Sequence, residues 1–246
     1  MTPEVFPSET ALAAALARRI IGAIKRSPGI VLGLPTGRTP LALYEELVHI
    51  GRADAVDWSE VRTFNLDEFV GCGSDDEGSY RRFMNERFFS RVGICKEHIG
   101  FLDGRAPDLA AECSRYERAI VRVGGIDLMI LGIGANGHIG FNEPADHLID
   151  RTHVARLDEE TRAGNALWFG GDVRRVPREA LTMGMATILA ARTIVLIAAG
   201  EAKAAAVKAM TDGGITTRVP ASFLRLHSQV SVLLDQPLSD AVATLR

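Results

Sequence analysis

A histidine, an asparagine and a glutamate share one glycine-rich stretch of the chain, residues 132–144 (G-I-G-A-N-G-H-I-G-F-N-E-P). The imidazole of His138 can transfer protons near pH 7, and a nearby carboxylate such as Glu143 can orient it and raise its basicity. Asn136 adds an amide to the same stretch. A lone histidine is usually structural, but a histidine among glycines with these two partners favours a site for acid–base chemistry.

The same stretch contains a formal G-x-G-x-x-G, which is the spacing of dinucleotide-binding loops. That motif must open a helix, whereas Gly140 and the pair Glu143–Pro144 would break any helix within two turns. We therefore expect a loop here rather than a dinucleotide site.

Two adjacent acids, Asp67 and Glu68, end the apolar run 61–66. Neighbouring residues of a strand point to opposite faces, so we expect only one of the two carboxylates to enter a site. A carboxylate at a strand end beside an anion pocket is a natural general base, because partial burial moves its pKa toward neutral. Considered alone, this segment is equally compatible with a solvated pair of acids in a loop.

A candidate anion site lies at residues 33–40 (G-L-P-T-G-R-T-P), between a predicted strand and a predicted helix. The N–H groups at a helix N-terminus bind anions, and this segment adds hydroxyls, a glycine and a guanidinium: Thr36, Gly37, Arg38 and Thr39. It is not a Walker A loop, because the spacing is one residue short and no Lys precedes the Thr. A tight turn that needs glycine is the alternative, and phosphate binding is the stronger interpretation.

Lys203 occupies a second predicted turn from strand to helix, in G-E-A-K at 200–203. A lysine in the first turn of a helix opposes the helix dipole, and a bound anion would offset that cost. By itself Lys203 is compatible with an ordinary surface lysine. Together with the 33–40 loop it suggests a second cation for the same anion.

The elements that must position these residues alternate along the chain. Helices are predicted over 10–25 (with Ser8 as its cap), 39–50, 79–92, 107–123, 178–190 and 201–210, and strands over 30–34, 61–66, 126–133, 193–199 and 229–234. This pattern predicts an α/β fold with an open, mostly parallel sheet and helices on both faces, a three-layer, Rossmann-like arrangement. Ligands of such sheets bind at the carboxyl ends of the strands, where all of these motifs fall. We expect one domain over residues 1–246.

Composition excludes several classes of function. The chain has 28 Lys+Arg and 31 Asp+Glu, a net charge of −3, which argues against a nucleic-acid partner because phosphate backbones require a basic stripe. No segment approaches the ~20 apolar residues that span a bilayer, so no membrane partner is expected. Three cysteines at unrelated spacings, Cys72, Cys95 and Cys113, and histidines without metal-ligand spacing argue against disulfides and metal sites and favour the cytoplasm.

Several stretches resemble those of glucosamine-6-phosphate deaminases. They are T-F-N-L-D-E-F-V-G, S-Y-R-R-F-M, the 132–144 loop and V-P-R-E-A-L-T-M-G, and the likeness runs in order across residues 31–237. The related 6-phosphogluconolactonases share the Gly-Thr-Pro loop and the acid pair. They typically carry T-A-S-L-F-P after the Gly-His, where this chain has I-G-F-N-E-P at 139–144. The resemblance therefore favours the deaminases.

The resemblance implies an aldose–ketose isomerisation coupled to loss of ammonia, from D-glucosamine 6-phosphate and water to D-fructose 6-phosphate. It implies no metal and no organic cofactor. Asp67 would move a proton between C2 and C1 through an enolamine, and His138 would assist ring opening with support from Glu143. The residues that match the family's phosphate pocket are Thr36, Gly37, Thr39 and Lys203. A monomer and a small homo-oligomer are both compatible with it.

The chain departs from the family pattern in its candidate site. Many members carry Asp at the position of Asn136, so Glu143 here orients His138 with less help. A phosphate-binding Arg of the family is replaced by Leu167, whereas Arg38 stands where the family commonly has Gly or Ser. We hypothesise that the guanidinium that pairs with the phosphate has moved from one loop to the other.

Regulation should differ too. The allosterically regulated members carry two basic residues after the Glu-Pro, and the corresponding positions here are His153 and Ala155. We therefore expect no activation by N-acetylglucosamine 6-phosphate.

Three other functions stay open at this stage. A deaminase acting on the galactosamine epimer is compatible with the sequence, because the contacts to C4 of the sugar cannot be recognised in it, and a lactonase is a more distant alternative. A sugar-phosphate sensor would need a DNA-binding helix pair, whereas one helix is predicted before the strand at 30–34, and it would not need to keep Asp67 and His138.

Overall fold

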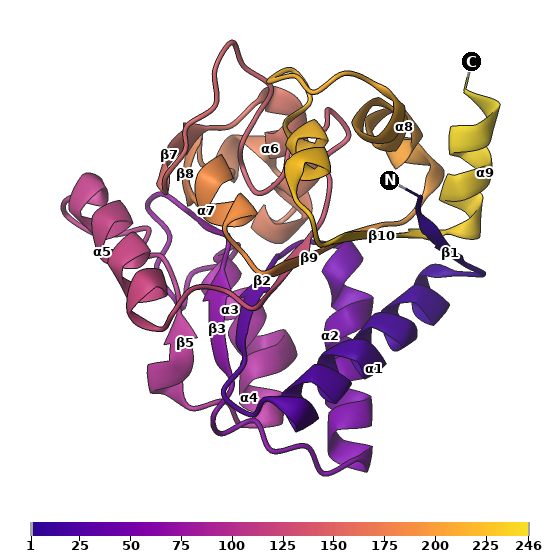
Figure 1. Ribbon diagram of the computed structural model, residues 1–246. Coiled ribbons are helices and arrows are strands. Elements are labelled where there is room, and N and C mark those ends of the chain that lie inside the picture. Colours follow the sequence, from indigo (N-terminus) through magenta and orange to yellow (C-terminus); the bar gives the residue numbers. More distant parts are fainter. Residues whose placement is uncertain (1, 246) are drawn as a thin grey trace.

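The computed structural model describes residues 2–245, whose strands form two sheets (Figure 1). The larger sheet contains β1 (Glu4–Phe6), β2 (Val31–Leu34), β3 (Arg62–Asn65), β5 (Ile99–Gly100), β6 (Leu128–Leu131), β9 (Thr193–Ala198) and β10 (Val230–Asp235). All its strands are parallel, in the order β1-β10-β9-β6-β2-β3-β5. The smaller sheet is antiparallel, in the order β4-β8-β7, and contains β4 (Asp67–Phe69), β7 (His153–Arg156) and β8 (Glu179–Thr182).

Helices cover both faces of the larger sheet. They are α1 (Glu9–Arg26), α2 (Thr39–Ala53), α3 (Tyr80–Met84), which continues through a π-helical turn into α4 (Ser90–Val92), α5 (Leu109–Arg122), α6 (Glu159–Asn165), α7 (Met185–Leu189), α8 (Ala204–Asp212) and α9 (Gln236–Thr244). Figure 1 shows α1, α2 and α4 on one side of β9 and β10, and α7 and α8 on the other. In the described part of the chain, no helix combines the length and apolar character needed to cross a bilayer.

Alternation along the strands explains the three layers. In β9, Ile194 and Leu196 pack into the core beneath α5, α7 and α8, whereas Val195 and Ile197 pack into the core beneath α1 and α2. Side chains of a strand alternate between its faces, so a strand with a helical layer on each side must be apolar at nearly every position. The predicted fold class is confirmed.

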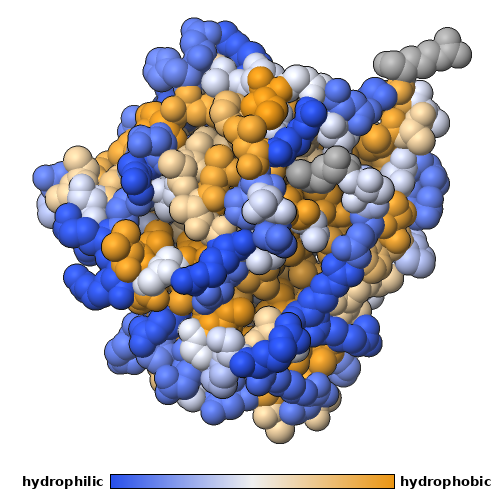
Figure 2. Space-filling view, viewed as in Figure 1, coloured by the Kyte–Doolittle hydropathy of each residue, from blue (hydrophilic) through white to orange (hydrophobic). Residues whose placement is uncertain are grey.

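Helix α1 illustrates how the local sequence builds one of these layers. The Ser8 hydroxyl accepts a hydrogen bond from the N–H of Ala11 at 3.1 Å, which confirms the predicted cap. The apolar face of the helix, including Leu16 and Ile20, is buried, and its hydrophilic residues face outward across the surface (Figure 2).

The order of the parallel strands places a crevice at one point of the sheet. From the central β2 the chain proceeds outward through β3 and β5, then returns to β6 beside β2 and proceeds the other way through β9 and β10. Loops that leave the carboxyl ends of β2 and β6 therefore diverge, and the space between them is a binding crevice. Two buried tyrosines fix strand ends beside it: the hydroxyl of Tyr44 donates to the carbonyl of Pro35, and that of Tyr116 donates to the carbonyl of Asn65.

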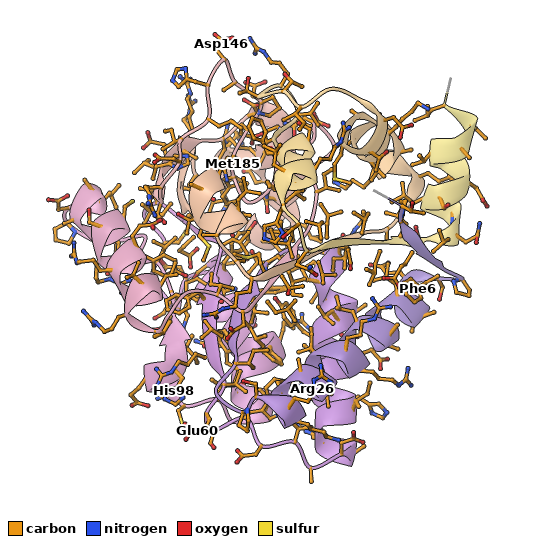
Figure 3. All side chains as sticks on the ribbon, in the orientation of Figure 1. Phe6, Arg26, Glu60, His98, Asp146 and Met185 are labelled. Carbon is orange, nitrogen blue, oxygen red and sulfur yellow. The ribbon has the colours of Figure 1, made fainter. Side chains whose placement is uncertain are left out.

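One predicted helix is wrong. Residues 178–190 form β8, a short turn and the five-residue α7, rather than one helix. Leu181 and Ala180 of β8 are fully buried and pair with β4 and β7, so sheet pairing outweighs the helix propensity of this segment. Met183 and Met185 are buried, as expected of core residues, and Met185 lies inside the upper helical layer (Figure 3). The first strand also lies earlier than predicted, at β1 rather than near Ile30.

Gly184 links β8 to α7 at a point where two backbone segments are closely packed. A Cβ added at Gly184 would lie 2.2 Å from the carbonyl oxygen of Arg151, and the carbonyls of the two preceding residues, Ile149 and Asp150, accept the first N–H groups of α7. We expect Gly184→Ala to lower the free energy of unfolding by about 2 kcal/mol or more, measured by urea denaturation. Gly29→Ala, whose Cβ would contact nothing within 4 Å, is the control, and an equal effect of the two variants would contradict this packing.

Candidate active site

A cavity of about 550 Å³ occupies the crevice between the loops that follow β2 and β6. Eight of the residues that the sequence singled out line it: Thr36, Gly37, Arg38, Thr39, Asp67, Asn136, His138 and Lys203. The ninth, Glu143, lies behind this lining and contacts His138. The structure therefore brings together residues from four separate segments of the chain.

The two adjacent acids have different surroundings. Asp67 lines the cavity and is 6% exposed, with the Thr36 hydroxyl 3.4 Å from its Oδ1. Glu68 points away from the cavity and accepts hydrogen bonds from the Ser79 hydroxyl and from the N–H groups of Phe69, Tyr80 and Arg81. Glu68 thus stabilises the N-terminus of α3, and only Asp67 can contact a ligand.

These surroundings raise the pKa of Asp67 more than that of Glu68 can be raised against its hydrogen bonds. Burial and, to a smaller extent, the charge of Glu68 raise the pKa of Asp67 to about 8, and only the hydrogen bond with Thr36 opposes the shift. Burial also raises the pKa of Glu68, but four hydrogen bonds to its carboxylate counteract this. Asp67 is therefore a carboxyl group that can hold or release a proton near neutral pH.

The 132–144 segment contains no helix, which confirms the expected loop. Gly134 contacts the His138 ring so closely that a Cβ there would lie 2.3 Å from it. The loop is held from behind by β8, because the N–H of Phe141 donates to the Thr182 hydroxyl at 3.0 Å and the Asn142 amide donates to the Met183 carbonyl at 2.8 Å.

His138 and Glu143 form a hydrogen-bonded pair. Their Nδ1 and Oε2 atoms lie 3.2 Å apart, and the Asn136 amide donates to the same Oε2 at 2.8 Å. Burial by itself would raise the pKa of Glu143, but hydrogen bonds with His138, Thr161 and Asn136 bring it below its ordinary value. An ionised carboxylate only accepts, so Nδ1 carries a proton and Nε2 is the ring nitrogen left for a ligand. Asn136 acts as a donor to Glu143, a role that an ionised Asp could not fill.

The opposite end of the cavity is cationic. Arg38 stands at the N-terminus of α2 without capping it through its side chain, and Lys203 lies across from it in the turn after β9. Burial lowers the pKa of Lys203, the Arg38 charge lowers it further, and Glu160 partly opposes the shift. Two cations that repel each other beside the N–H groups of a helix N-terminus form a site for a dianion.

Four residues without a predicted role also belong to the wall of the cavity. Tyr80 from α3, Thr161 and Asn165 from α6, and Trp168 after α6 also line it, and Leu167 lies at its rim with 70% of its surface exposed. Tyr80 belongs to the S-Y-R-R-F-M stretch of the family resemblance, but no role was predicted for it. Residues 161–165 match a Thr-Arg-x-x-Asn stretch of the family, which located Leu167, but nothing local indicated a role for Thr161 or Asn165 themselves.

Taken together, the cavity holds a protonatable carboxyl group, an imidazole–carboxylate pair and two cations. Such a set can transfer protons on a small molecule that is anchored by an anionic group. Within residues 2–245, no three His, Cys, Asp or Glu side chains cluster in a way that could hold a metal ion.

Comparisons with known proteins identify related chains. The family model of glucosamine-6-phosphate isomerases and 6-phosphogluconolactonase matches residues 7–233. A glucosamine-6-phosphate deaminase of Bacillus velezensis is 47% identical over 213 residues, which is 87% of this chain and 88% of that protein. Glucosamine-6-phosphate deaminase 2 of Bacillus subtilis is 47% identical over 225 residues, 91% of this chain and 89% of that one.

Solved structures identify the same family of proteins as the sequence comparisons. A structure described as a monomeric glucosamine-6-phosphate deaminase superposes with a TM-score of 0.95 at 41% identity, over 98% of this chain and 100% of the other. The 6-phosphogluconolactonase of Trypanosoma cruzi gives a TM-score of 0.75 at 19% identity, over 97% and 96% of the two chains. At this lower identity the second likeness shows the shared fold alone.

Burial of Asp67 predicts a pH-dependent cost to stability. Because its pKa is raised in the folded state, the stability linked to its protonation is present near pH 4 and is lost as pH rises through about 8. We expect the stability of Asp67→Asn relative to the unmodified chain to increase between pH 5 and pH 8.5, by on the order of 2 kcal/mol, in urea denaturation.

Asp172→Asn is the control for this experiment, because Asp172 is partly exposed and its pKa of about 2, lowered chiefly by its hydrogen bond with Arg174, lies below the range tested. The difference in free energy of unfolding between Asp172→Asn and the unmodified chain should stay constant from pH 5 to 8.5. A constant difference for Asp67→Asn as well would contradict the raised pKa.

Proposed function

The chain belongs to the family of glucosamine-6-phosphate isomerases and 6-phosphogluconolactonases, and we propose that within this family it is a glucosamine-6-phosphate deaminase. The relatives with 44–47% identity over most of their length are named as deaminases, whereas the lactonase structures share no more than 23% identity. The stretch I-G-F-N-E-P at 139–144 also resembles the deaminases rather than the lactonases.

The single observation that carries the proposal is the arrangement of proton-transfer groups around one anion-binding end. Asp67, His138 and the two cations Arg38 and Lys203 line the same cavity. Conversion of D-glucosamine 6-phosphate and water to D-fructose 6-phosphate and ammonia requires an anchored phosphate, a proton moved between two adjacent carbons, and help with ring opening. Each requirement has a candidate group in this cavity.

Ring opening is the first step. The C1 hydroxyl loses its proton, the bond between C1 and the ring oxygen breaks, and that oxygen takes up a proton. His138 can shuttle this proton through Nε2, because its Nδ1–H is directed at Glu143. The Glu143 carboxylate stabilises the imidazolium while the proton is on the ring.

Isomerisation and loss of ammonia follow in the open chain. Asp67 in its ionised form removes the proton from C2 while a proton of the C2 ammonium group moves to the C1 oxygen, which gives an enolamine, and the protonated Asp67 then returns its proton to C1. The product is an imine at C2. Water adds to this imine, and the C–N bond breaks to release ammonia and leave the ketone of D-fructose 6-phosphate. The raised pKa of Asp67, about 8, suits a group that must both accept and return a proton.

Ammonia release tests the proposed function directly. We expect the chain to release ammonia from glucosamine 6-phosphate, and Asp67→Asn to lower kcat by about three orders of magnitude or more, because an amide cannot take the C2 proton. Galactosamine 6-phosphate assayed in parallel distinguishes the epimers, and 6-phosphogluconolactone tests the lactonase. Ammonia release from neither amino sugar would refute the proposed function.

Arg38 provides the test of the phosphate end. We expect Arg38→Ala to raise KM for the phosphorylated sugar about tenfold to a hundredfold, because a charge-assisted hydrogen bond is lost, while kcat changes little. Adding Leu167→Arg to this variant should restore much of the affinity, since it places a guanidinium on the other rim of the cavity. Arg174→Ala, an exposed arginine paired with Asp172, is the control. An unchanged KM in Arg38→Ala would contradict the proposed exchange.

A further inference from the structure

A threonine from α6 contacts the His138–Glu143 pair. Thr161 is 6% exposed, and its hydroxyl oxygen lies 3.4 Å from Nδ1 of His138. The Nδ1 proton is directed at Glu143, and the Thr161 hydroxyl contacts the same ring nitrogen and contributes to lowering the pKa of Glu143. Thr161 therefore contacts the His138–Glu143 pair on the side that faces α6.

The position of Thr161 is linked to the other side of the cavity through Asn165. The Asn165 amide donates to the Thr161 carbonyl at 2.9 Å, and its Oδ1 accepts a hydrogen bond from the Tyr80 hydroxyl at 2.7 Å. The Arg162 side chain, by contrast, bonds to the carbonyls of Val173 and Val176, which belong to the segment that follows α6. Among these side-chain contacts of α6, the one with Tyr80 is the one that reaches α3.

Tyr80 itself is rigidly held beside the proposed base. Its ring lies 4.7 Å from that of Phe69 and stacks on that of Phe141 at 6.0 Å, measured between centroids. Its N–H donates to Glu68 at 3.0 Å, so the residue next to Asp67 in the chain also fixes the start of α3. The Tyr80 hydroxyl is thus at a defined position relative to Asp67.

We propose that Thr161 is a positioning residue for the His138–Glu143 pair, and that the Tyr80 hydroxyl sets its position through Asn165. The path from Glu68 through Tyr80, Asn165 and Thr161 then ties the two proton-transfer groups together across the mouth of the cavity, although they lie on separate segments of the chain. The consequence for catalysis rests on the proposed function, but the positioning of the pair does not.

Two substitutions at Thr161 distinguish the effect of its hydroxyl group from the effect of its side-chain volume. Thr161→Val keeps the volume and removes the hydrogen bond, whereas Thr161→Ser keeps the hydroxyl. We expect Thr161→Val to lower kcat about tenfold with KM changed less than about twofold, and Thr161→Ser to restore kcat to within about twofold. Thr211→Val on α8, whose hydroxyl bonds within its own helix, should leave both constants unchanged.

A double-mutant cycle tests the role of Tyr80. Tyr80→Phe keeps the stacked ring and removes the bond to Asn165. If Tyr80 acts through Thr161, the loss in kcat for Tyr80→Phe combined with Thr161→Val should be no greater than about that of Thr161→Val alone. Independent roles would multiply the two losses, and that outcome would overturn the proposed path.

A spectroscopic readout that needs no substrate completes the test. The His138 Nδ1–H proton, hydrogen-bonded to Glu143, should give a protected imidazole resonance in NMR spectra of the full chain. We expect this resonance to broaden or disappear in Thr161→Val and to persist in Thr161→Ser. Equal spectra of these two variants would overturn the positioning role, even if no ammonia release were found and the proposed function had failed.

Discussion

The geometry of the candidate site depends on one short strand, β8, which is hydrogen-bonded on both sides. On one side Thr182 is paired with Asp67 of β4, and the Met183 N–H donates to the Leu66 carbonyl at 2.8 Å. On its other edge β8 pairs with β7, and the Thr182 side chain and the carbonyl of the next residue, Met183, hold the 132–144 loop through Phe141 and Asn142. The carboxyl group and the imidazole that face the cavity are therefore spaced by one rigid element, which is the arrangement that proton transfer to two parts of one substrate requires.

Three buried carboxyl groups around the cavity show how hydrogen bonds decide their protonation. Glu68 has four donors and is structural, and Glu143 has donors that lower its pKa and keep it ionised beside His138. Asp67 has only the Thr36 hydroxyl as a hydrogen-bond donor, so burial and the charge of the neighbouring Glu68 raise its pKa to about 8. The adjacent acids in the sequence are chemically distinct only because the N-terminus of α3 supplies its N–H groups to one of them.

The sequence could predict the elements whose signal is local. The apolar runs of the parallel strands, the Ser8 cap and the absence of a helix after the Gly132–Gly134 pair all follow from residue patterns within a few positions. The small sheet could not be predicted in the same way, because β8 is too short and too rich in helix-forming residues to indicate a strand without its partners. Thr161 and Asn165 were missed for a similar reason, since their role depends on contacts with residues 23 and 85 positions away.

The charges of the cavity also explain how a base with a raised pKa could act on a phosphorylated amino sugar. With Asp67 protonated, the cavity presents the cations Arg38 and Lys203 to the phosphate with less opposing charge. An amino sugar carries an ammonium group at C2, next to the proton that must be removed. Once bound beside Asp67, that positive charge favours the ionised carboxylate and lowers its pKa. Under the proposed function, the substrate itself therefore generates the base that acts on it, and a lactone, which has no such group, would not.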